Sequence, residues 1–302
     1  MIPARFAHLR DDPALDGVTR ALIGHGHATV RDAVPTALVD AINRELADRF
    51  ARTPFCIGAF HGERTKRFHG LLRRAPSSQA LVMHATALRT ARRILGAWCD
   101  SPQLNLSQGL AIHPGAPAQI PHRDQAMWPG PKDAMEYSLN IIWPLDDFTA
   151  ANGATRVWPD THGVHEPYRP DAAPPPEPLV CEMRRGDMLL LLGSVLHAAG
   201  ANRTGRPRRA IIVSYCLGWL KTYENQNLTY DRAFARTLDP ELAAMIGYRW
   251  QRPNLGTFDG QCPSVLLGDV EIDDHLPTVD SFTPEQKRIV DAHRERELAT
   301  AC

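Results

Sequence analysis

The sequence predicts a mainly β protein with a core of the jelly-roll type and helices on either side of that core along the chain. Several short runs rich in branched and aromatic residues lie between residues 104 and 217, separated by turn residues. Helical spacing of apolar residues dominates before this segment and returns after residue 225. No internal repeat or low-complexity tract is visible, so we expect one domain over residues 1–302.

The N-terminal part, residues 1–100, is expected to be mostly helical. Residues 35–50 carry apolar side chains at three- and four-residue steps, and Pro35 suits the first turn of a helix. Weaker patterns indicate two further helices and a short strand, at residues 18–23, 79–97 and 28–30.

A basic segment, residues 52–76, has a loop-like sequence. It contains Arg64, Lys66 and Arg67, followed by Phe68. A solvated loop is the simplest interpretation, and a basic lip over an anionic co-substrate is the functional alternative. The role of Arg64 to Arg67 stays open at this point.

The β core is expected over residues 104–220. Each strand ends at a turn signal, such as Asn152-Gly153. The proline-rich segment 167–178 is expected to be an irregular connection. The remaining chain, 225–302, is expected to be helical. The strands are predicted at 104–112, 137–143, 154–158, 180–183, 188–192 and 211–217, and the later helices at 240–246 and 285–298.

Composition limits the classes of protein that the chain can belong to. Lys+Arg and Asp+Glu both number 34, so nothing favours nucleic acid or an anionic membrane as a partner. No apolar run is long enough to span a membrane, and the N-terminus lacks a signal-peptide pattern, so we expect a cytoplasmic protein. The six cysteines are scattered without a C-x-x-C pair and are expected to be mostly free thiols. The sequence is compatible with a homodimer.

The pair His122-x-Asp124 is the first candidate for metal binding. Side chains two apart on an extended segment point to the same side and can chelate one ion. Two histidines and one carboxylate suit non-haem Fe(II) and leave positions for a co-substrate and O₂. The pattern alone is weak, because 13 histidines produce about one chance match and His61-x-Glu63 and His293-x-Glu295 also fit it.

A third ligand and a cation follow later in the core. His197 ends an apolar strand and is followed by small residues, although an ordinary core histidine would fit the same pattern. Arg208 comes eleven residues later, at the start of the next strand. If these strands are antiparallel, Arg208 lies near the metal and can fork onto a carboxylate. Its neighbours Arg206 and Arg209 are expected to be solvated.

The segment from Gln119 to Trp219 resembles the phytanoyl-CoA dioxygenase family of Fe(II)/2-oxoglutarate oxygenases. The resemblance rests on His122-x-Asp124, on the block over residues 145–162 that contains Ala-Asn-Gly-Ala-Thr-Arg and Pro-x-x-His, on Gly186-Asp187, and on His197 and Arg208. The segment 214–226 resembles a natural-product-tailoring sub-branch that includes verruculogen-type endoperoxide and meroterpenoid oxygenases.

This resemblance implies a double-stranded β-helix core, a jelly roll. It implies iron ligands at His122, Asp124 and His197, and a pairing of Arg208 with the C5 carboxylate of 2-oxoglutarate. It also implies that Gln119 and Thr155 hydrogen-bond 2-oxoglutarate; from the residues alone they are a loop polar group and an ordinary strand threonine. Related halogenases replace the carboxylate ligand with a small residue, so the intact aspartate argues for oxygenation.

The implied activity is oxidation of an unactivated C–H bond by Fe(II), 2-oxoglutarate and O₂, with release of succinate and CO₂. Hydroxylation, desaturation or epoxidation of a small, largely hydrophobic natural product is expected. Most of the pocket candidates are apolar or aromatic, as suits such a ligand, although Trp128 and Trp219 fit a core role equally well and Asn140 fits a satisfied buried amide. The candidates are Phe68, Leu72, Met127, Trp128, Asn140 and Trp219.

Three alternatives remain from the sequence. An acyl-CoA or an amino-acid-like metabolite could be the substrate, since the basic segment could face a phosphate or carboxylate. A cupin-type metalloenzyme without 2-oxoglutarate would share the fold but would leave Arg208 without an evident partner. A non-catalytic jelly-roll module has no physical need for three intact ligands.

Overall fold

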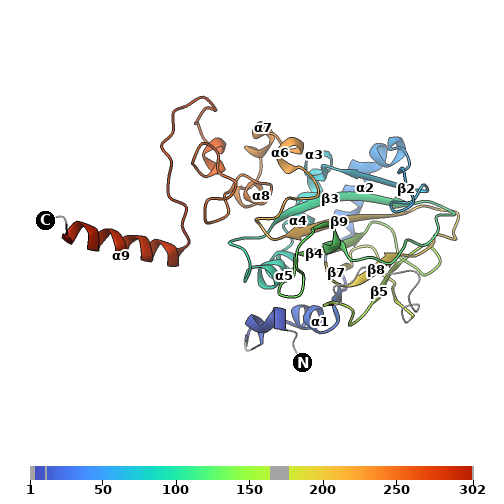
Figure 1. Cartoon of the computed structure of the whole chain (residues 1–302). Helices are drawn as coiled ribbons and strands as arrows, with labels where there is room; N and C mark the ends of the chain where they lie inside the picture. The colour runs from blue at the N-terminus through green and yellow to red at the C-terminus, as the bar shows by residue number, and fades with distance from the viewer. Residues whose placement is uncertain (1–3, 11, 164–176, 301–302) are drawn as a thin grey trace.

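The computed structural model describes residues 4–10, 12–163 and 177–300, and its centre is a pair of antiparallel sheets (Figure 1). The major sheet has the strand order β1-β7-β4-β9-β3-β2, and the minor sheet the order β6-β5-β8. The predicted jelly-roll core with flanking helices is confirmed. The strands are β1 His27–Val30, β2 Thr65–His69, β3 Gln103–Ile112, β4 Ser138–Pro144, β5 Thr155–Trp158, β6 Leu179–Cys181, β7 Met188–Leu192, β8 Leu196–Ala199 and β9 Arg208–Cys216.

The helices lie before and after most of these strands. They are α1 Gly17–His25, α2 Thr36–Arg52, α3 Leu71–Arg74, α4 Gln79–Val82, α5 Ala85–Leu95, α6 Gln226–Thr229, α7 Arg232–Ala235, α8 Pro240–Met245 and α9 Pro284–Thr300. Short 3-10 helices occur as η1 Ala4–Leu9, η2 Pro76–Ser78, η3 Asp124–Met127 and η4 Pro263–Leu267. No helix in these ranges is long and apolar enough to cross a membrane.

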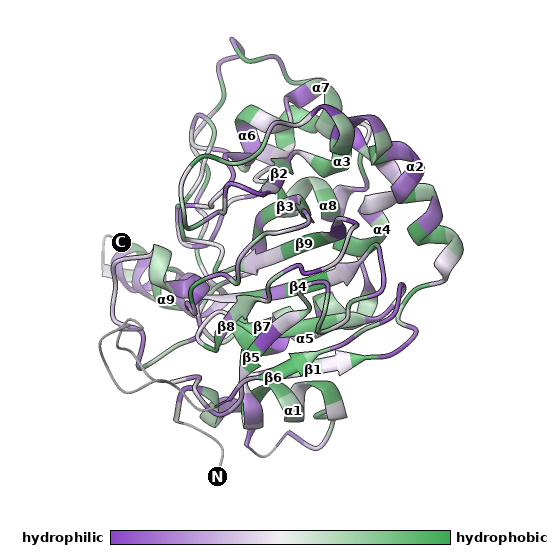
Figure 2. Cartoon of the chain, turned by 90° about the vertical axis from the view of Figure 1, so that its right-hand side faces the viewer, coloured by the Kyte–Doolittle hydropathy of each residue, from purple (hydrophilic) through white to green (hydrophobic). Residues whose placement is uncertain are grey.

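The major sheet separates a helix-covered core from the space between the two sheets. On β4, Leu139 and Ile141 face the helices, while Asn140 and Ile142 face the minor sheet, because side chains of a strand alternate between its faces. Figure 2 shows the strands of this sheet stacked from β2 at the top to β1 at the bottom. The same alternation on every strand gives the sheet two chemically different faces.

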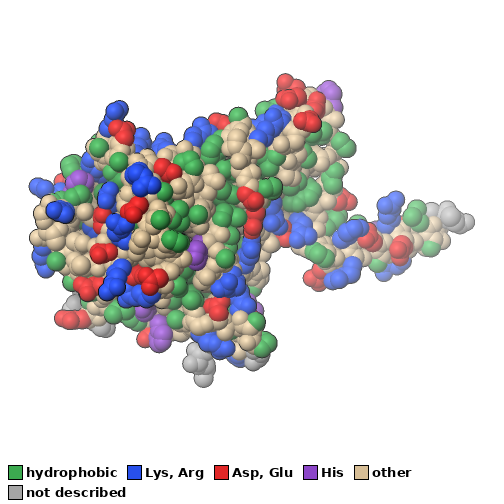
Figure 3. Space-filling view, turned by 180° about the vertical axis from the view of Figure 1, so that it is seen from behind, with side chains coloured by type: hydrophobic (Ala, Val, Ile, Leu, Met, Phe, Trp, Pro, Cys, Tyr) green, Lys and Arg blue, Asp and Glu red, His purple; other side chains and the backbone are tan. Residues whose placement is uncertain are grey.

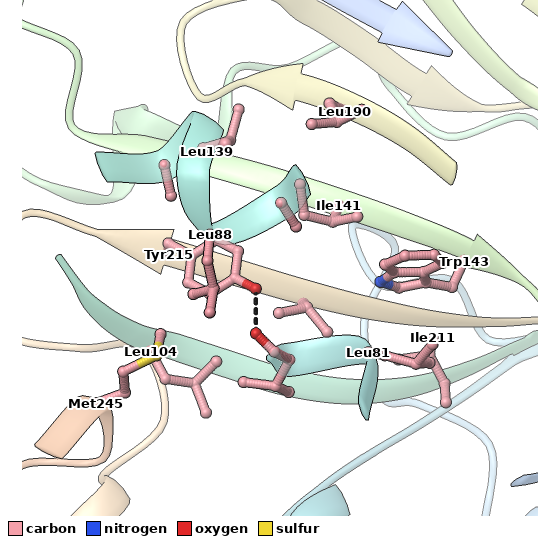
Figure 4. Close-up of a cluster of buried hydrophobic side chains, with 14 of the residues drawn as sticks. Leu81, Leu88, Leu104, Leu139, Ile141, Trp143, Leu190, Ile211, Tyr215 and Met245 are labelled. Carbon is pink, nitrogen blue, oxygen red and sulfur yellow. Dashed lines mark hydrogen bonds between the residues drawn. The ribbon is translucent and has the colours of Figure 1, made fainter. Parts of the chain in front are cut away.

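The helix side of the sheet is packed with large apolar side chains (Figure 4). Leu88 of α5 and Met245 of α8 meet side chains of β3, β4 and β9 there. Each fully buried side chain of this size stabilises the fold by about 1.5–3 kcal/mol. The hydroxyl of Tyr215 donates to the carbonyl of Val82 at 2.6 Å, whereas the indole N–H of Trp143 in the same view has no hydrogen-bond partner among the described residues.

The N-terminal part contributes strands as well as helices. The predicted strand at 28–30 is found as β1, paired with β7. The loop predicted over 52–76 is wrong at Thr65–His69, which form β2 and pair with β3 over five residues. Polar residues gave this segment little strand character in the sequence, but an edge position in a sheet needs only backbone hydrogen bonds and one face against the protein.

One predicted helix is divided in two. The helix expected over 79–97 is broken between α4 and α5 at His84, whose backbone is extended (φ −60°, ψ 122°) and whose Nε2 contacts the carbonyl oxygen of Ala33 at 3.2 Å. Some helices begin at a capping side chain, as where the Asp16 side chain accepts from the backbone N–H of Thr19 at the start of α1.

The last helix stands apart from the rest of the protein. α9 projects away from the sheets in Figure 1, and none of its side chains is buried. Figure 3 shows cationic and anionic side chains mixed along it. The proline-rich segment predicted as irregular lies outside the described residues, except for residues 177 and 178.

Candidate metal and co-substrate site

Three side chains converge between the two sheets. The ligand atoms of His122, Asp124 and His197 all lie within 4.8 Å of one another. His122 Nε2 is 3.5 Å from Asp124 Oδ1, and His197 Nε2 is 3.4 Å from Asp124 Oδ2. Both imidazoles therefore direct the same nitrogen at one carboxylate, which is the arrangement of a facial two-histidine, one-carboxylate metal site.

Backbone pairing places these ligands. His122 and His197 face each other as an antiparallel pair, with N–H to O distances of 2.9 and 3.0 Å in the two directions. Arg123 is extended (φ −117°, ψ 125°), so residues 122 and 124 point to the same side before the 3-10 helix η3 begins. The predicted chelating geometry therefore comes from one strand and its neighbour.

The second ring nitrogen of each histidine has its own backbone partner. His122 Nδ1 lies 3.0 Å from the carbonyl oxygen of Ile120, and His197 Nδ1 lies 3.1 Å from that of Val195. A carbonyl oxygen only accepts, so each Nδ1 carries a proton, and each Nε2 is the nitrogen left to bind a metal ion. Both tautomers are set for metal binding.

Charge in this site is strongly coupled. Burial alone would raise the pKa of Asp124, but His197 and His122 hold it far below its ordinary value. Burial alone would lower the pKa of His197, whereas the Asp124 carboxylate raises it. Asn140 donates from Nδ2 to Asp124 Oδ2 at 2.7 Å and so orients the carboxylate. A divalent cation would replace the protons that this pair otherwise attracts.

His122, Asp124 and His197 line a cavity of about 340 Å³, and the fully buried Arg208 lines the same cavity. The Arg208 guanidinium stacks on the ring of Phe148 at 4.1 Å, and its Nη2 donates to the carbonyl of Gly153 at 2.8 Å. Burial lowers the pKa of Arg208 to about 9, and the charge of Arg67 adds to that effect. In the described part of the chain, Arg208 Nε makes no hydrogen bond. A buried cation with an open N–H is suited to an incoming carboxylate.

Gln119 and Thr155 also line the cavity. The backbone of Gln119 donates to the carbonyl of Ala199, and its amide oxygen accepts from the Ala199 N–H at 3.4 Å. Its amide nitrogen donates to the carbonyl of Phe60 at 3.2 Å. Phe60 lies edge-on to the ring of His122 at 5.0 Å, so this loop covers one metal ligand.

Of the six predicted pocket residues, Met127 and Asn140 line the cavity, and four are placed elsewhere. Phe68 faces the helix side of β2, where its ring meets that of Phe50 at 4.8 Å, because it alternates with the cavity-facing Arg67. Leu72, on α3, is fully buried in the same helix-side core.

The two tryptophans are also outside the cavity wall. Trp128 is buried, and its indole N–H donates to the carbonyl of Lys221 at 2.8 Å. Trp219 is 42% exposed, and its indole N–H donates to the carbonyl of Trp98. Both indoles hold loops together, as a strand or loop tryptophan commonly does.

The sequence analysis did not single out several residues of the cavity wall. They come from β3 and from loops: Phe60, Asn105, Gln108 and Tyr223, together with His61, which the sequence offered only as a chance match to the H-x-[DE] pattern. Arg67 was considered only as part of a basic segment. A β-bulge between Leu104 and Leu106 brings Asn105 to the cavity, and no feature of the sequence marks that bulge. Alternation along Thr65–His69 could have placed Arg67 and Phe68 on opposite faces if the segment had been predicted as a strand.

A jelly roll that holds a facial triad beside a buried arginine defines the class of iron- and 2-oxoglutarate-dependent oxygenases. The chain belongs to the phytanoyl-CoA dioxygenase (PhyH) family, whose family model matches residues 24–210. It is therefore an Fe(II)- and 2-oxoglutarate-dependent oxygenase, as the sequence predicted. Family membership sets aside both the cupin-type enzyme without 2-oxoglutarate and the non-catalytic module.

Curated dioxygenases are similar to this chain in sequence, and solved structures are similar to it in fold. Dioxygenase olcK of Penicillium canescens is 28% identical over 90% of this chain and 91% of its own length. Dioxygenase FUM3 of Gibberella moniliformis is 27% identical over 79% and 84% of the two chains. The fold is similar to that of the epimerase SnoN in complex with Fe³⁺, α-ketoglutarate and nogalamycin RO (TM-score 0.56, 19% identity, 67% and 83% coverage). HygX from Streptomyces hygroscopicus with nickel, 2-oxoglutarate and hygromycin B gives a TM-score of 0.55 at 15% identity, over 70% and 90%.

Proposed function

We propose that His122, Asp124 and His197 bind Fe(II) and that Arg208 binds the C5 carboxylate of 2-oxoglutarate. The observation that carries this proposal is the buried Arg208 guanidinium, with its open Nε–H, in the same cavity as the triad. A dicarboxylate held at the metal by one end would supply the anion that this guanidinium lacks at the other.

Two further side chains act on 2-oxoglutarate in this proposal. Gln119 and Thr155 border the cavity from the minor-sheet side and hydrogen-bond the co-substrate between its two ends. The whole chain, residues 1–302, acts as one oxygenase domain. The pairing of β1 and β2 with core strands supports this, since the N-terminal part completes the major sheet.

Iron with 2-oxoglutarate and O₂ supplies the oxidising power that breaks an unactivated C–H bond, with release of succinate and CO₂. The residues of the chain orient the metal-binding groups and exclude water from the site. Asn140 holds the Asp124 carboxylate in its orientation, and the two backbone carbonyls hold the imidazoles. Phe60 and Met127, which are 49% and 41% exposed, border the mouth, where a bound substrate would cover them and exclude water.

The substrate is a small, largely hydrophobic natural product that is hydroxylated, desaturated or epoxidised. Apolar side chains on the sheet floor and at the mouth support this proposal; they are Leu106, Leu110, Ile142, Ile212, Phe60 and Met127. The similarity in fold to SnoN and HygX, whose structures contain nogalamycin RO and hygromycin B, is in line with a natural product as substrate and does not bear on its polarity.

An acyl-CoA substrate has less support. The CoA phosphates would need several cations at the mouth, but two of the basic residues are engaged elsewhere. Lys66 donates to the carbonyls of Phe50 and Ala51 at 2.9 Å each, and Arg64 donates to that of Pro114 at 3.2 Å. Neither residue lines the cavity.

Anaerobic absorption spectroscopy tests the metal assignment. Fe(II) and 2-oxoglutarate together should produce a metal-to-ligand charge-transfer band in the wild-type protein. His122→Ala should lose that band, because one ligand and its strand-fixed lone pair are gone. His293→Ala is the matched control, since His293 fits the same H-x-[DE] pattern but lies on the exposed helix α9. A band of full intensity in His122→Ala would contradict the assignment.

A further inference from the structure

A second arginine, Arg67, faces the cavity from the edge strand β2. Its position follows from register: Arg67 is opposite Leu110, which also lines the cavity, while the flanking Lys66 and Phe68 face the other way. Arg67 Nε is buried and makes no hydrogen bond within the residues that the structure describes. The cavity therefore contains a second arginine N–H without a protein acceptor. Arg67 is on β2 and Arg208 on β9, and β3 lies between these two strands.

The neighbours that hold Arg67 in place are neutral. Its Nη1 donates to Gln108 Oε1 at 2.8 Å, and Gln108 Nε2 in turn contacts His69 Nε2 at 2.8 Å. Burial and the adjacent arginine lower the pKa of His69 to about 4, so this ring is uncharged at neutral pH and accepts from the amide. The ring of Tyr223 lies against His69, with centroids 5.5 Å apart. These contacts orient the guanidinium without neutralising it.

The nearby acidic side chains Asp124 and Glu224 have other partners. Asp124 is committed to the metal, and Glu224 accepts from the backbone N–H of Ser107 at 3.2 Å. Arg123, on the minor-sheet side of the cavity, donates to the carbonyl of Thr161. Burial lowers the pKa of Arg67, as expected where a cation is removed from water without a paired anion.

The sum of the charges in the loaded cavity indicates what Arg67 can bind. The charges of Fe(II) and Arg208 are cancelled by the Asp124 carboxylate and the two carboxylates of 2-oxoglutarate. Two arginines of the cavity wall then remain: Arg123 beside the minor sheet, and Arg67 on the side formed by β2 and β3. A partly buried guanidinium such as that of Arg67, whose Nε–H lacks an acceptor among the described residues, is unfavourable until an anion pairs with it.

We propose that Arg67 binds an anionic group of the primary substrate, so that the substrate is a largely apolar molecule with one carboxylate. This inference rests on the proposed function and specifies its substrate class. The carboxylate anchors one end of the molecule beside β2, and the apolar remainder lies along the sheet floor toward the metal. Arg67 is a substrate-binding residue in this arrangement, separate from the co-substrate site.

The test uses anaerobic enzyme loaded with Fe(II) and 2-oxoglutarate, with two matched pairs of probes. These are dodecanoic acid with methyl dodecanoate, and abietic acid with methyl abietate. Binding is followed by the perturbation of the charge-transfer band. At least one acid should bind the wild-type protein about tenfold or more tightly than its ester, because only the acid can form the ion pair.

Variants at the arginine identify the group responsible. Arg67→Met should remove the preference for acid over ester, and Arg67→Lys should retain part of it. Arg64→Met is the matched control, because Arg64 is basic, exposed and outside the cavity wall, and it should behave as the wild-type protein. The affinity for 2-oxoglutarate should change by less than about twofold in all three variants.

Each contrary result is distinct. If wild-type protein prefers neither acid over its ester, the inference is overturned. If Arg67→Met weakens 2-oxoglutarate binding instead, the anion belongs to the co-substrate and the inference is again overturned, while the proposed function stands. If wild-type protein gives no charge-transfer band at all, the proposed function fails and this inference fails with it.

Discussion

Arg208 and Arg209 are neighbours on β9, but they lie on opposite faces of the sheet and only Arg209 has an acidic partner among the described residues. Arg209, on the helix side, forms a paired contact with Asp146, at 3.0 Å from Nε and 2.7 Å from Nη2. The Asp146 carboxylate raises the pKa of Arg209, whereas burial lowers that of Arg208. On the helix side, Arg209 has an acidic partner and the Tyr215 hydroxyl has a carbonyl partner. The cavity side leaves N–H groups open, and those are the groups available to ligands.

The largest expected effect is the loss of 2-oxoglutarate affinity when Arg208 is replaced. Arg208→Leu should weaken 2-oxoglutarate binding by about 100-fold or more, since it removes the buried partner of a carboxylate. Its free energy of unfolding without ligand should stay the same or rise, because an uncompensated buried charge is gone. Arg209→Leu should do the reverse, with nearly unchanged 2-oxoglutarate binding and about 1 kcal/mol less stability for this partly exposed pair. Calorimetric titration and urea unfolding would measure both, and equal loss of affinity in the two variants would contradict the comparison.

Asn140 provides a second test on the cavity side. Asn140→Ala removes the donor to Asp124 Oδ2 and should weaken Fe(II) binding by about 10–100-fold, as loss of an orienting partner usually does. Stability of the metal-free protein should change little. The measurement is an anaerobic competition titration with a metal chelator. Unchanged iron affinity would mean that the carboxylate needs no such support.

Tyr215 provides the matching test on the helix side. Tyr215→Phe leaves the buried carbonyl of Val82 without its donor and should cost about 1–3 kcal/mol of stability. Affinities for iron and 2-oxoglutarate should remain those of the wild-type protein. Urea unfolding with a parallel ligand titration checks this, and altered 2-oxoglutarate binding would show that the two faces are not independent.

The last prediction concerns pH and Glu136, a buried acid outside the cavity wall. Burial raises the pKa of Glu136 to about 7, although Arg5 at 3.4 Å and the hydroxyl and N–H of Ser194 act to lower it. The folded state then binds the proton more tightly than the unfolded state, whose pKa is near 4.5. Stability should therefore fall as pH rises from about 4.5 to about 7, by on the order of 1–3 kcal/mol, and stay level above that.

Thermal unfolding at several pH values would measure this trend. Glu136→Gln should flatten the profile over that range, while Glu285→Gln, on the exposed helix α9, should leave it unchanged. A wild-type profile that rises between pH 5 and 7, with no difference in Glu136→Gln, would show that the carboxyl is ionised throughout.

Much of the fold and the centre of the site could be predicted from the sequence, for physical reasons that differ. The strand at Met188–Leu192 has the predicted bounds because a short, continuous run of apolar residues suits a strand buried on both faces. His122, Asp124 and His197 were predicted because metal chemistry limits residue types and their spacing. The structure brings these three side chains together, and their roles as ligands stay a prediction.

The cavity wall was harder to predict because it depends on register. Phe68 and Leu72 are apolar, as suits a pocket wall, but they face the helix-side core. Arg67 was interpreted from the sequence as part of a solvated loop. Asn105 reaches the cavity through a bulge. The strand β2, which was not predicted, decides that Arg67 faces the cavity and that its neighbours Lys66 and Phe68 do not. Composition does not contain that information, because strand pairing decides it.

A crystal structure of the anaerobic complex with Fe(II) and 2-oxoglutarate tests the central claim most directly. We expect iron bound by Nε2 of His122 and His197 and by the Asp124 carboxylate, with the C5 carboxylate of 2-oxoglutarate paired with Arg208 Nε. A C5 carboxylate paired with Arg67, while Arg208 keeps only its contact with Gly153, would contradict it.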